Sequence, residues 1–98
     1  MFRLTVQDVF FIKNRGLVAT GVVEAGEIRV GDEVQINGAR AVVVEAVERF
    51  RKKLDHAVAG DNVGLLFSGL DRSNLSQGDV LTSAGGELTT SSGVEVSL

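Results

Sequence analysis

Apolar residues recur at every second position in several short runs of the chain, and Gly and Asp separate these runs. A period of two is typical of strands with one buried face, whereas an amphipathic helix repeats about every 3.6 residues. The pattern therefore predicts an all-β chain, in which residues 71–77 lack alternation and could form one helical turn. We expect three sets of side chains to face the core: Leu4 and Val6; Val42, Val44 and Ala46; Val63, Leu65 and Phe67.

The dipeptide Gly-Asp opens an apolar run three times. Gly permits turn conformations, and an Asp carboxylate can accept hydrogen bonds from nearby backbone amides. We therefore predict that strands begin directly after these pairs. The spacings between the pairs differ, so they do not indicate a repeat architecture. The pairs are Gly31-Asp32, Gly60-Asp61 and Gly78-Asp79.

The first apolar run changes parity near Asp8. The alternate apolar residues between positions 2 and 6 share one face, whereas Val9 and Phe11 fall on the opposite parity. One extra residue in a β-bulge turns every later side chain to the other face, so the switch predicts a bulge near Asp8. Residues 13–16 then read as a hairpin turn, in which Asn14 or Gly16 suits a left-handed backbone.

The number of short strands indicates whether the sheet closes into a barrel. Six to eight strands in a chain of 98 residues favour a closed barrel, because closure removes exposed strand edges. Residues 85–93 are rich in Gly, Ser and Thr, so the last residues form either a loosely held strand or a linker.

Composition mainly excludes classes of function. The chain has no cysteine for a disulfide or a thiolate nucleophile, and no GxxxxGK[ST] sequence to bind nucleotide phosphates. His56 is the single histidine, which leaves little from which to build a metal site or a hydrolase triad. The first residues lack the apolar centre of a signal peptide and the length of a membrane span. We expect a cytoplasmic protein that is not an enzyme and needs no cofactor, metal or membrane.

Charge singles out one segment and one residue. The net charge is −3, yet Arg49 and residues 51–53 place four of the ten basic residues in one five-residue window. This window is either a solvated loop or a local contact with RNA. Glu48 shares the parity of residues 42–46, so it lies either at a barrel rim in water or in a pocket where it accepts a hydrogen bond from a ligand. Asp8 raises the same question, with backbone capping as its alternative.

Several collinear stretches of the chain resemble the second domain of elongation factor Tu. They are residues 8–10, 16–24, 28–34, 47–52, 59–64 and 77–81. The resemblance runs from about residue 2 to residue 85. It implies a six-stranded antiparallel closed β-barrel over residues 1–86, followed at residues 87–98 by a tail or an extra C-terminal strand.

The resemblance also implies roles for individual residues, because this domain of the family receives the aminoacylated 3′ end of transfer RNA. An apolar slot stacks a base, and a carboxylate can accept from a ribose 2′-hydroxyl. The terminal adenosine would be held by Ile12, Val18, Leu66 and Glu48. The aminoacyl group would be held by Asp8, Phe10, Thr20 and Asn62, and the basic residues facing RNA would be Arg15, Arg51 and Lys52.

Two functions lead on these grounds, ahead of a third class, a small enzyme that hydrolyses aminoacyl esters through Glu48. The first is a module that binds an aminoacylated CCA end or another RNA 3′ end, which the matching pocket residues favour. The second is a protein-interaction adaptor that docks on a GTPase domain or the ribosome without binding RNA. Gln7, which replaces an acidic residue of the family, and the acidic net charge favour the second. Exposed barrel edges could also drive homo-oligomerisation, and Met1 together with the added tail favours a freestanding protein.

Overall fold

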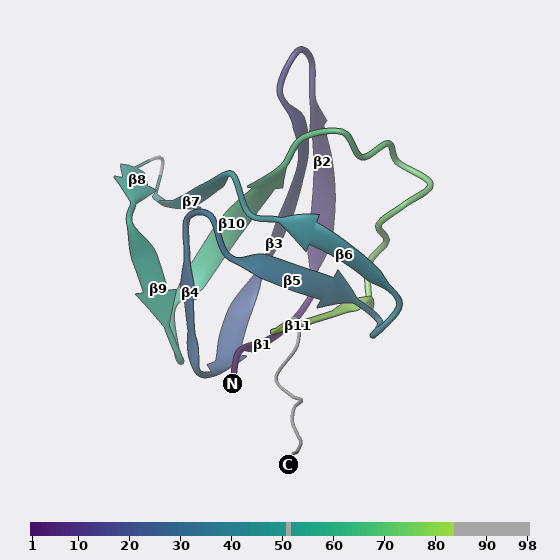
Figure 1. Ribbon diagram of the computed structural model, residues 1–98. Coiled ribbons are helices and arrows are strands. Elements are labelled where there is room, and N and C mark those ends of the chain that lie inside the picture. The colour runs from purple at the N-terminus through teal and green to yellow at the C-terminus, as the bar shows by residue number, and fades with distance from the viewer. Residues whose placement is uncertain (51, 84–98) are drawn as a thin grey trace.

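The computed structural model describes residues 1–50 and 52–83, and these consist of short strands joined by turns (Figure 1). The predicted boundary at residue 86 and the tail at residues 87–98 lie outside the described residues, as does Arg51. In chain order the strands are β1 (Arg3–Thr5), β2 (Asp8–Ile12), β3 (Gly16–Ala25), β4 (Glu27–Arg29), β5 (Glu33–Ile36), β6 (Arg40–Val43), β7 (Ala46–Arg49), β8 (Lys52–Leu54), β9 (His56–Val58), β10 (Asn62–Phe67) and β11 (Val80–Ser83).

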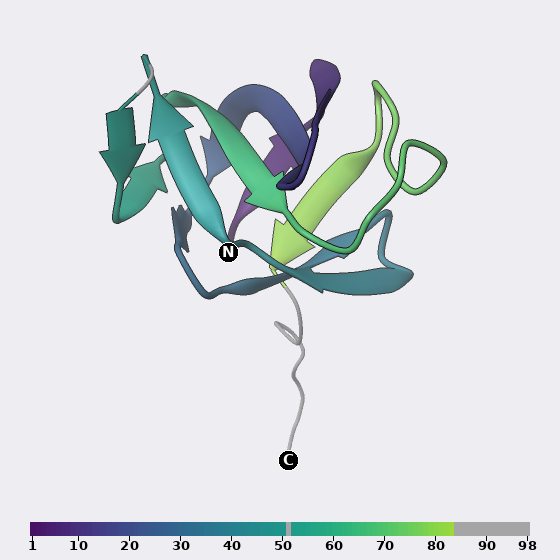
Figure 2. The same ribbon diagram turned by 90° about the horizontal axis from the view of Figure 1, so that it is seen from above.

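Most strands belong to one curled antiparallel sheet. Its order is β6-β5-β11-β1-β3-β10-β7-β8, with β2 also paired to β3, and β4 pairs separately with β9. Viewed from above, the strands curl around a common interior and form a half-barrel (Figure 2). The all-β prediction is confirmed. The six-stranded closed barrel stays a prediction, because the ladder of the described residues ends at β6 and β8.

The core lies inside this curl. Inward and outward side chains alternate along the long strand β3, where Leu17, Ala19 and Val23 are buried. Burial of a large apolar side chain stabilises a fold by about 1.5–3 kcal/mol, so the interior holds the strands together. Among the residues predicted from the sequence to face the core, those that are buried are Leu4, Val6, Val44, Val63, Leu65 and Phe67.

The predicted set over residues 42–46 is wrong beyond Val44. Val44 is fully buried, but the next fully buried residue is Val47. The two are an odd number of positions apart, whereas residues on one face of a strand are an even number apart. Ala46 is half-buried and Val42 only packs against the core from its margin. The apolar parity therefore changes between Val44 and Val47.

The change has a structural cause in the connection between β6 and β7. Val44 N donates to Asp32 O at 2.8 Å, whereas Glu45 N donates to Leu66 O at 2.8 Å. The chain thus leaves the neighbourhood of β5 and joins β10 within two residues, and alternation restarts there. Glu48 consequently lies on the outer face of the sheet, opposite in direction to its buried neighbour Val47.

The predicted bulge near Asp8 is present. Leu4 pairs with Val23 and Asp8 pairs with Thr20, so four steps on one strand match three steps on the other. Gln7 N also donates to Thr20 O at 2.7 Å. Two successive residues therefore oppose Thr20, which is the arrangement of a bulge.

The three Gly-Asp pairs form the same turn. Each Asp carboxylate accepts from the backbone amide three residues earlier, and a strand begins at the next residue, as predicted. The glycines have φ values of 95°, 97° and 93°, in the left-handed region. The amide-to-carboxylate contacts are Arg29 to Asp32 at 2.9 Å, Val58 to Asp61 at 3.0 Å, and Ser76 to Asp79 at 2.8 Å.

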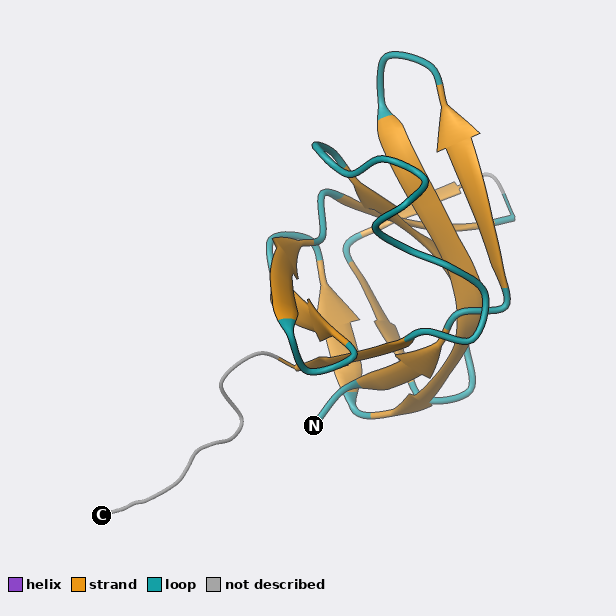
Figure 3. Cartoon of the chain, turned by 90° about the vertical axis from the view of Figure 1, so that its right-hand side faces the viewer, coloured by secondary structure: helices purple, strands orange, loops and turns teal. Residues whose placement is uncertain are grey.

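The hairpin turn between β2 and β3 is also confirmed. Arg15 N donates to Ile12 O at 3.0 Å, and Asn14 and Gly16 both have positive φ. The resulting hairpin projects beyond the other strands (Figure 3). The helical turn over residues 71–77 is wrong, because this segment forms turns instead.

Side chains explain why no helix forms over residues 71–77. Asp71 accepts from the amide and the hydroxyl of Ser73, and Asn74 accepts from the Asp71 amide at 3.0 Å. Such local contacts compete with helical hydrogen bonds. The hydrogen bonds from Ser73 also hold the pKa of Asp71 below its ordinary value.

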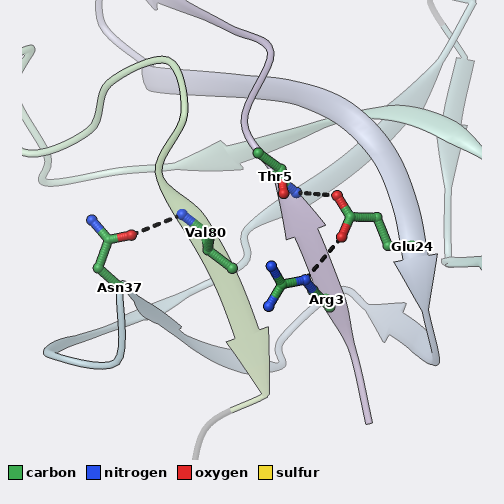
Figure 4. A network of polar contacts seen from close by, with 5 residues as sticks. All are labelled: Arg3, Thr5, Glu24, Asn37 and Val80. Carbon is green, nitrogen blue, oxygen red and sulfur yellow. Dashed lines mark hydrogen bonds and ion pairs between the residues drawn. The ribbon is translucent and has the colours of Figure 1, made fainter.

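Polar side chains fasten β1 and β11 to their neighbours (Figure 4). Glu24 accepts hydrogen bonds from Arg3 Nε at 2.9 Å and Thr5 N at 3.2 Å. Asn37 Oδ1 accepts from Val80 N at 2.9 Å. Hydrogen bonds from Thr5 and Arg3 hold the pKa of Glu24 below its ordinary value.

Candidate functional site

Four neighbouring strands, in the order β2, β3, β10 and β7, carry most of the predicted site residues. Their register aligns Asp8 with Thr20, Thr20 with Gly64, and Gly64 with Glu48. These residues form one row across the sheet. Because side chains alternate between faces, they share the outer face while Val47 points into the core.

A second row lies one step along the same face. Phe10 pairs with Val18, Val18 with Leu66, and Leu66 with Ala46. The structure thereby brings to one face all eight residues predicted to hold an RNA end and its acyl group: Ile12, Val18, Glu48, Leu66, Asp8, Phe10, Thr20 and Asn62.

Gly64 leaves the middle of this face bare. A Cβ at Gly64 would lie 3.0 Å from Val18 Cγ1 and 3.9 Å from Thr20 Cγ2. Any side chain there would crowd Val18 and project between Thr20 and Glu48. The absence of a side chain at Gly64 therefore leaves the surface of β10 open between β3 and β7.

Two hollows adjoin the ion pair between Arg15 and Glu48. The first, of about 320 Å³, is lined by Thr20, Glu48, Arg49, Phe50, Asn62, Val63 and Gly64. The second, of about 420 Å³, is lined by Arg15, Val30, Glu45, Ala46, Val47, Lys53, Leu54, Asp55 and Leu66. Arg15 Nη2 lies 3.6 Å from Glu48 Oε2. Since Glu48 lines one hollow and Arg15 the other, their ion pair stands at the border between them.

Glu48 occupies an intermediate position between the two alternatives posed by the sequence. Its side chain is 31% exposed and lies on the outer face, not among the core residues. Lys53 lies directly opposite it across β7 and β8, and Arg15 approaches from the β2–β3 hairpin. The carboxylate is therefore accessible to a ligand, with Arg15 at 3.6 Å and a lysine at the paired position of β8.

The turn between β7 and β8 adds residues that the sequence reasoning did not assign to the site. Arg49 Nη1 donates to Asp61 Oδ1 at 3.0 Å, and its guanidinium carbon lies 5.1 Å from the centroid of the Phe50 ring. Phe50 is 83% exposed and has a φ of 53°. A bulky residue in the left-handed region costs about 1–3 kcal/mol, and such strain clusters at functional sites. The sequence did contain a signal for this part of the site, because Phe50 is an aromatic residue within a run of basic residues.

The basic residues near the site do not lie together in one cluster. Arg15 lines the larger of the two hollows, whereas Lys52 and Lys53 project to opposite faces of β8. Arg49 is held by Asp61, so this part of the basic window is not simply a solvated loop. Arg51 lies outside the described residues.

Phe10 shares the outer face but lines a different hollow. That hollow, of about 360 Å³, is formed with Val9, Phe11, Arg72 and Leu75 along β2. Phe10 is therefore separated from the hollow that contains Thr20 and Asn62.

The described part of the chain contains no group of three or more His, Cys, Asp or Glu side chains arranged to hold a metal ion. His56 lies on β9, with its Nε2 atom 3.8 Å from Glu27 Oε2. Among residues 1–50 and 52–83 there is also no helix of sufficient length and apolar character to cross a membrane.

A comparison with protein-family models finds a match to the model described as elongation factor Tu domain 2 over residues 16–82. The matched range includes five of the outer-face positions, namely Val18, Thr20, Glu48, Asn62 and Leu66. It begins after Asp8, Phe10, Ile12 and Arg15.

Proposed function

The chain belongs to the family of elongation factor Tu domain 2, and on this basis we propose that it is a non-catalytic translation-factor module that binds an RNA 3′ end. The ligand is the aminoacylated CCA end of transfer RNA or a related RNA end. It lies on the outer face of β2, β3, β10 and β7, and residues 1–86 complete the six-stranded closed barrel of the family.

The observation that supports this proposal is a pair of hollows, one lined by Glu48 and the other by Arg15, which adjoin the ion pair between these two residues. A 3′-aminoacylated nucleoside has two bulky parts, a base and an acyl group, which are joined through a ribose that carries a free hydroxyl. The hollow floored by Leu66 and Ala46 takes the base. The hollow lined by Thr20 and Asn62 takes the acyl group, and Glu48 accepts a hydrogen bond from the ribose hydroxyl.

Charge and chemistry agree with a binding role. With a net charge of −3, the chain offers phosphates only local contacts, which Arg15, Lys52 and Lys53 provide. Stacking of one base contributes about 1–3 kcal/mol, so the isolated module binds weakly. Its affinity depends strongly on salt, because phosphate contacts release counterions.

An amide NMR titration at low salt tests the proposal. The labelled protein is titrated with a short aminoacylated CCA-ended RNA and with the same RNA after deacylation. We expect shifts at Thr20, Glu48, Asn62 and Leu66, with tighter binding of the acylated RNA. Glu48→Gln should weaken binding, whereas the control Glu33→Gln, on β5, should not. If no amide moves at millimolar RNA, the RNA-end proposal fails.

A second candidate function is an adaptor that docks on a GTPase or ribosomal partner without binding RNA. The observation that favours it is the exposure of Phe10 and Phe11, which are 54% and 49% accessible on β2. The two rings lie on opposite faces of β2, so a partner that covers this strand would bury both of them.

A further inference from the structure

Strand β2 has a free edge. It pairs with β3 on one side, and within the described residues no other strand pairs with it. Unpaired edges present rows of N–H and C=O groups to which another chain can add. The edge carries Phe10 and Phe11 and has a single charged residue, Asp8.

The hairpin turn shows which backbone groups face outward. Ile12 O accepts from Arg15 N, so the backbone of Ile12 faces the β3 side. Backbone groups alternate in direction along an antiparallel strand, so those of Phe10 also face β3. The N–H and C=O groups of Val9 and Phe11 therefore point away from β3, toward the free edge.

A hollow lies beside this edge. It measures about 360 Å³ and combines Val9, Phe10 and Phe11 with two residues of the segment between β10 and β11, Leu75 and Arg72. This segment runs beside β2 (Figure 1). The hollow is apolar on the β2 side and bears a cation on the other side.

Arg72 supplies that cation. Its guanidinium carbon lies 5.5 Å from the centroid of the Phe11 ring. Its neighbour Asp71 is engaged by Ser73, and within residues 1–50 and 52–83 no carboxylate lies in ion-pair distance of Arg72. The positive charge is available to an anionic group that enters the hollow.

We propose that the free edge of β2 binds an extended peptide segment of a partner protein, which adds a strand beside β2. Its backbone pairs with the outward groups of Val9 and Phe11, as in other cases of strand addition. Its apolar side chains cover Phe10 and Phe11, and an acidic side chain pairs with Arg72. This surface is separate from the two hollows beside the Arg15–Glu48 ion pair. Of the residues that line it, Phe10 is the one that the family resemblance also assigns to the aminoacyl group.

Hydrogen exchange with a defined peptide tests the proposal on the full chain. The probe is an acetylated and amidated octapeptide of alternating valine and threonine with one central glutamate. We expect the amides of Val9 and Phe11 to become protected, while the Phe10 amide, already directed at β3, changes little. The same peptide with every second amide N-methylated should not bind. Absence of protection at millimolar peptide, or equal binding of the methylated peptide, overturns the proposal.

A charge exchange isolates the role of Arg72. Arg72→Gln should weaken the glutamate peptide about two- to fivefold, as for an exposed ion pair, and leave a glutamine version unchanged. The matched control is Arg15→Gln, which removes a cation from the β2–β3 hairpin outside this hollow. An equal loss for both peptides contradicts the assigned ion pair.

Two further outcomes separate this surface from its alternatives. Glu48→Gln should leave peptide binding intact, so failure of the RNA proposal does not affect this one. If Val9 and Phe11 are protected without peptide, in proportion to protein concentration and with a dimeric mass, a second copy occupies the edge and the peptide proposal is wrong.

Discussion

The two sides of β3 use polar side chains differently. On the side of β1, β11 and β5, polar groups join strands to one another, as Glu24 does with Arg3 and Thr5. On the side of β10 and β7, Thr20, Glu48 and Asn62 line a hollow. The first arrangement stabilises the fold, and the second leaves hydrogen-bonding groups open to a ligand. The same residue types therefore have different consequences according to the side on which they lie.

Two glycines give the largest expected contrast. A Cβ on Gly21 would lie 2.6 Å from Thr5 O and 2.9 Å from Leu4 Cδ2, whereas one on Gly64 would approach Val18 Cγ1 at 3.0 Å. Backbone moves less readily than a side chain, so Gly21→Ala should lower the free energy of unfolding by about 1–3 kcal/mol. Gly64→Ala should cost less than Gly21→Ala. Urea unfolding of both variants measures the difference.

For RNA binding we expect the opposite order, with Gly64→Ala reducing the affinity more than Gly21→Ala does. Gly64→Ala places a methyl group between Thr20 and Glu48 and should reduce binding of an aminoacylated RNA end, which NMR titration of the folded variant measures. Unchanged affinity in Gly64→Ala would show that the ligand does not use this floor.

Two asparagines give a smaller contrast of the same kind. Asn37 bonds Val80 N at 2.9 Å and Asp79 Oδ1 at 3.1 Å. Asn37→Gly keeps a residue suited to the φ of 52° and removes both bonds, so it should lower the free energy of unfolding by about 1–2 kcal/mol. Asn62→Ala should change stability by only about 0.5 kcal/mol, since exposed positions tolerate substitution. Equal losses in thermal unfolding would contradict the division between the two sides.

The pH dependence of stability gives the smallest effect. The pKa of Glu24 is lowered in the folded protein from its ordinary value of 4.5, so its contribution is fully present above pH 4.5. It is lost as the pH falls through the lower folded-state pKa. Glu24→Gln should therefore be less stable than the parent protein at neutral pH, and the two should converge in acid. Urea midpoints from pH 7 down to pH 3 measure this convergence, and a constant gap would count against it.

Local features of the fold were predictable because neighbouring residues decide them. The turn at Gly60-Asp61 needs only a left-handed glycine and a carboxylate within reach of Val58 N. The parity switch at Asp8 likewise records a bulge in the few residues that join β1 to β2. Both features leave a signal in a few neighbouring residues of the sequence.

Features of the candidate site were less predictable because they depend on how strands meet. Parity placed Glu48 on the core face, but the connection at Val44 and Glu45 restarts the alternation and turns Glu48 outward. Phe10 shares its face with Thr20, yet lines another hollow because the segment before β11 lies beside β2.

By itself, the sequence of this protein determined the all-β class, the three Gly-Asp turns, the bulge and the family, because each is written in spacing and residue type over a few neighbours. The tertiary structure alone decided which residues share a hollow, that Arg15 meets Glu48, and that no second strand of the described residues pairs with β2. These depend on register between strands far apart in the chain, and register is set by the packing of the whole core.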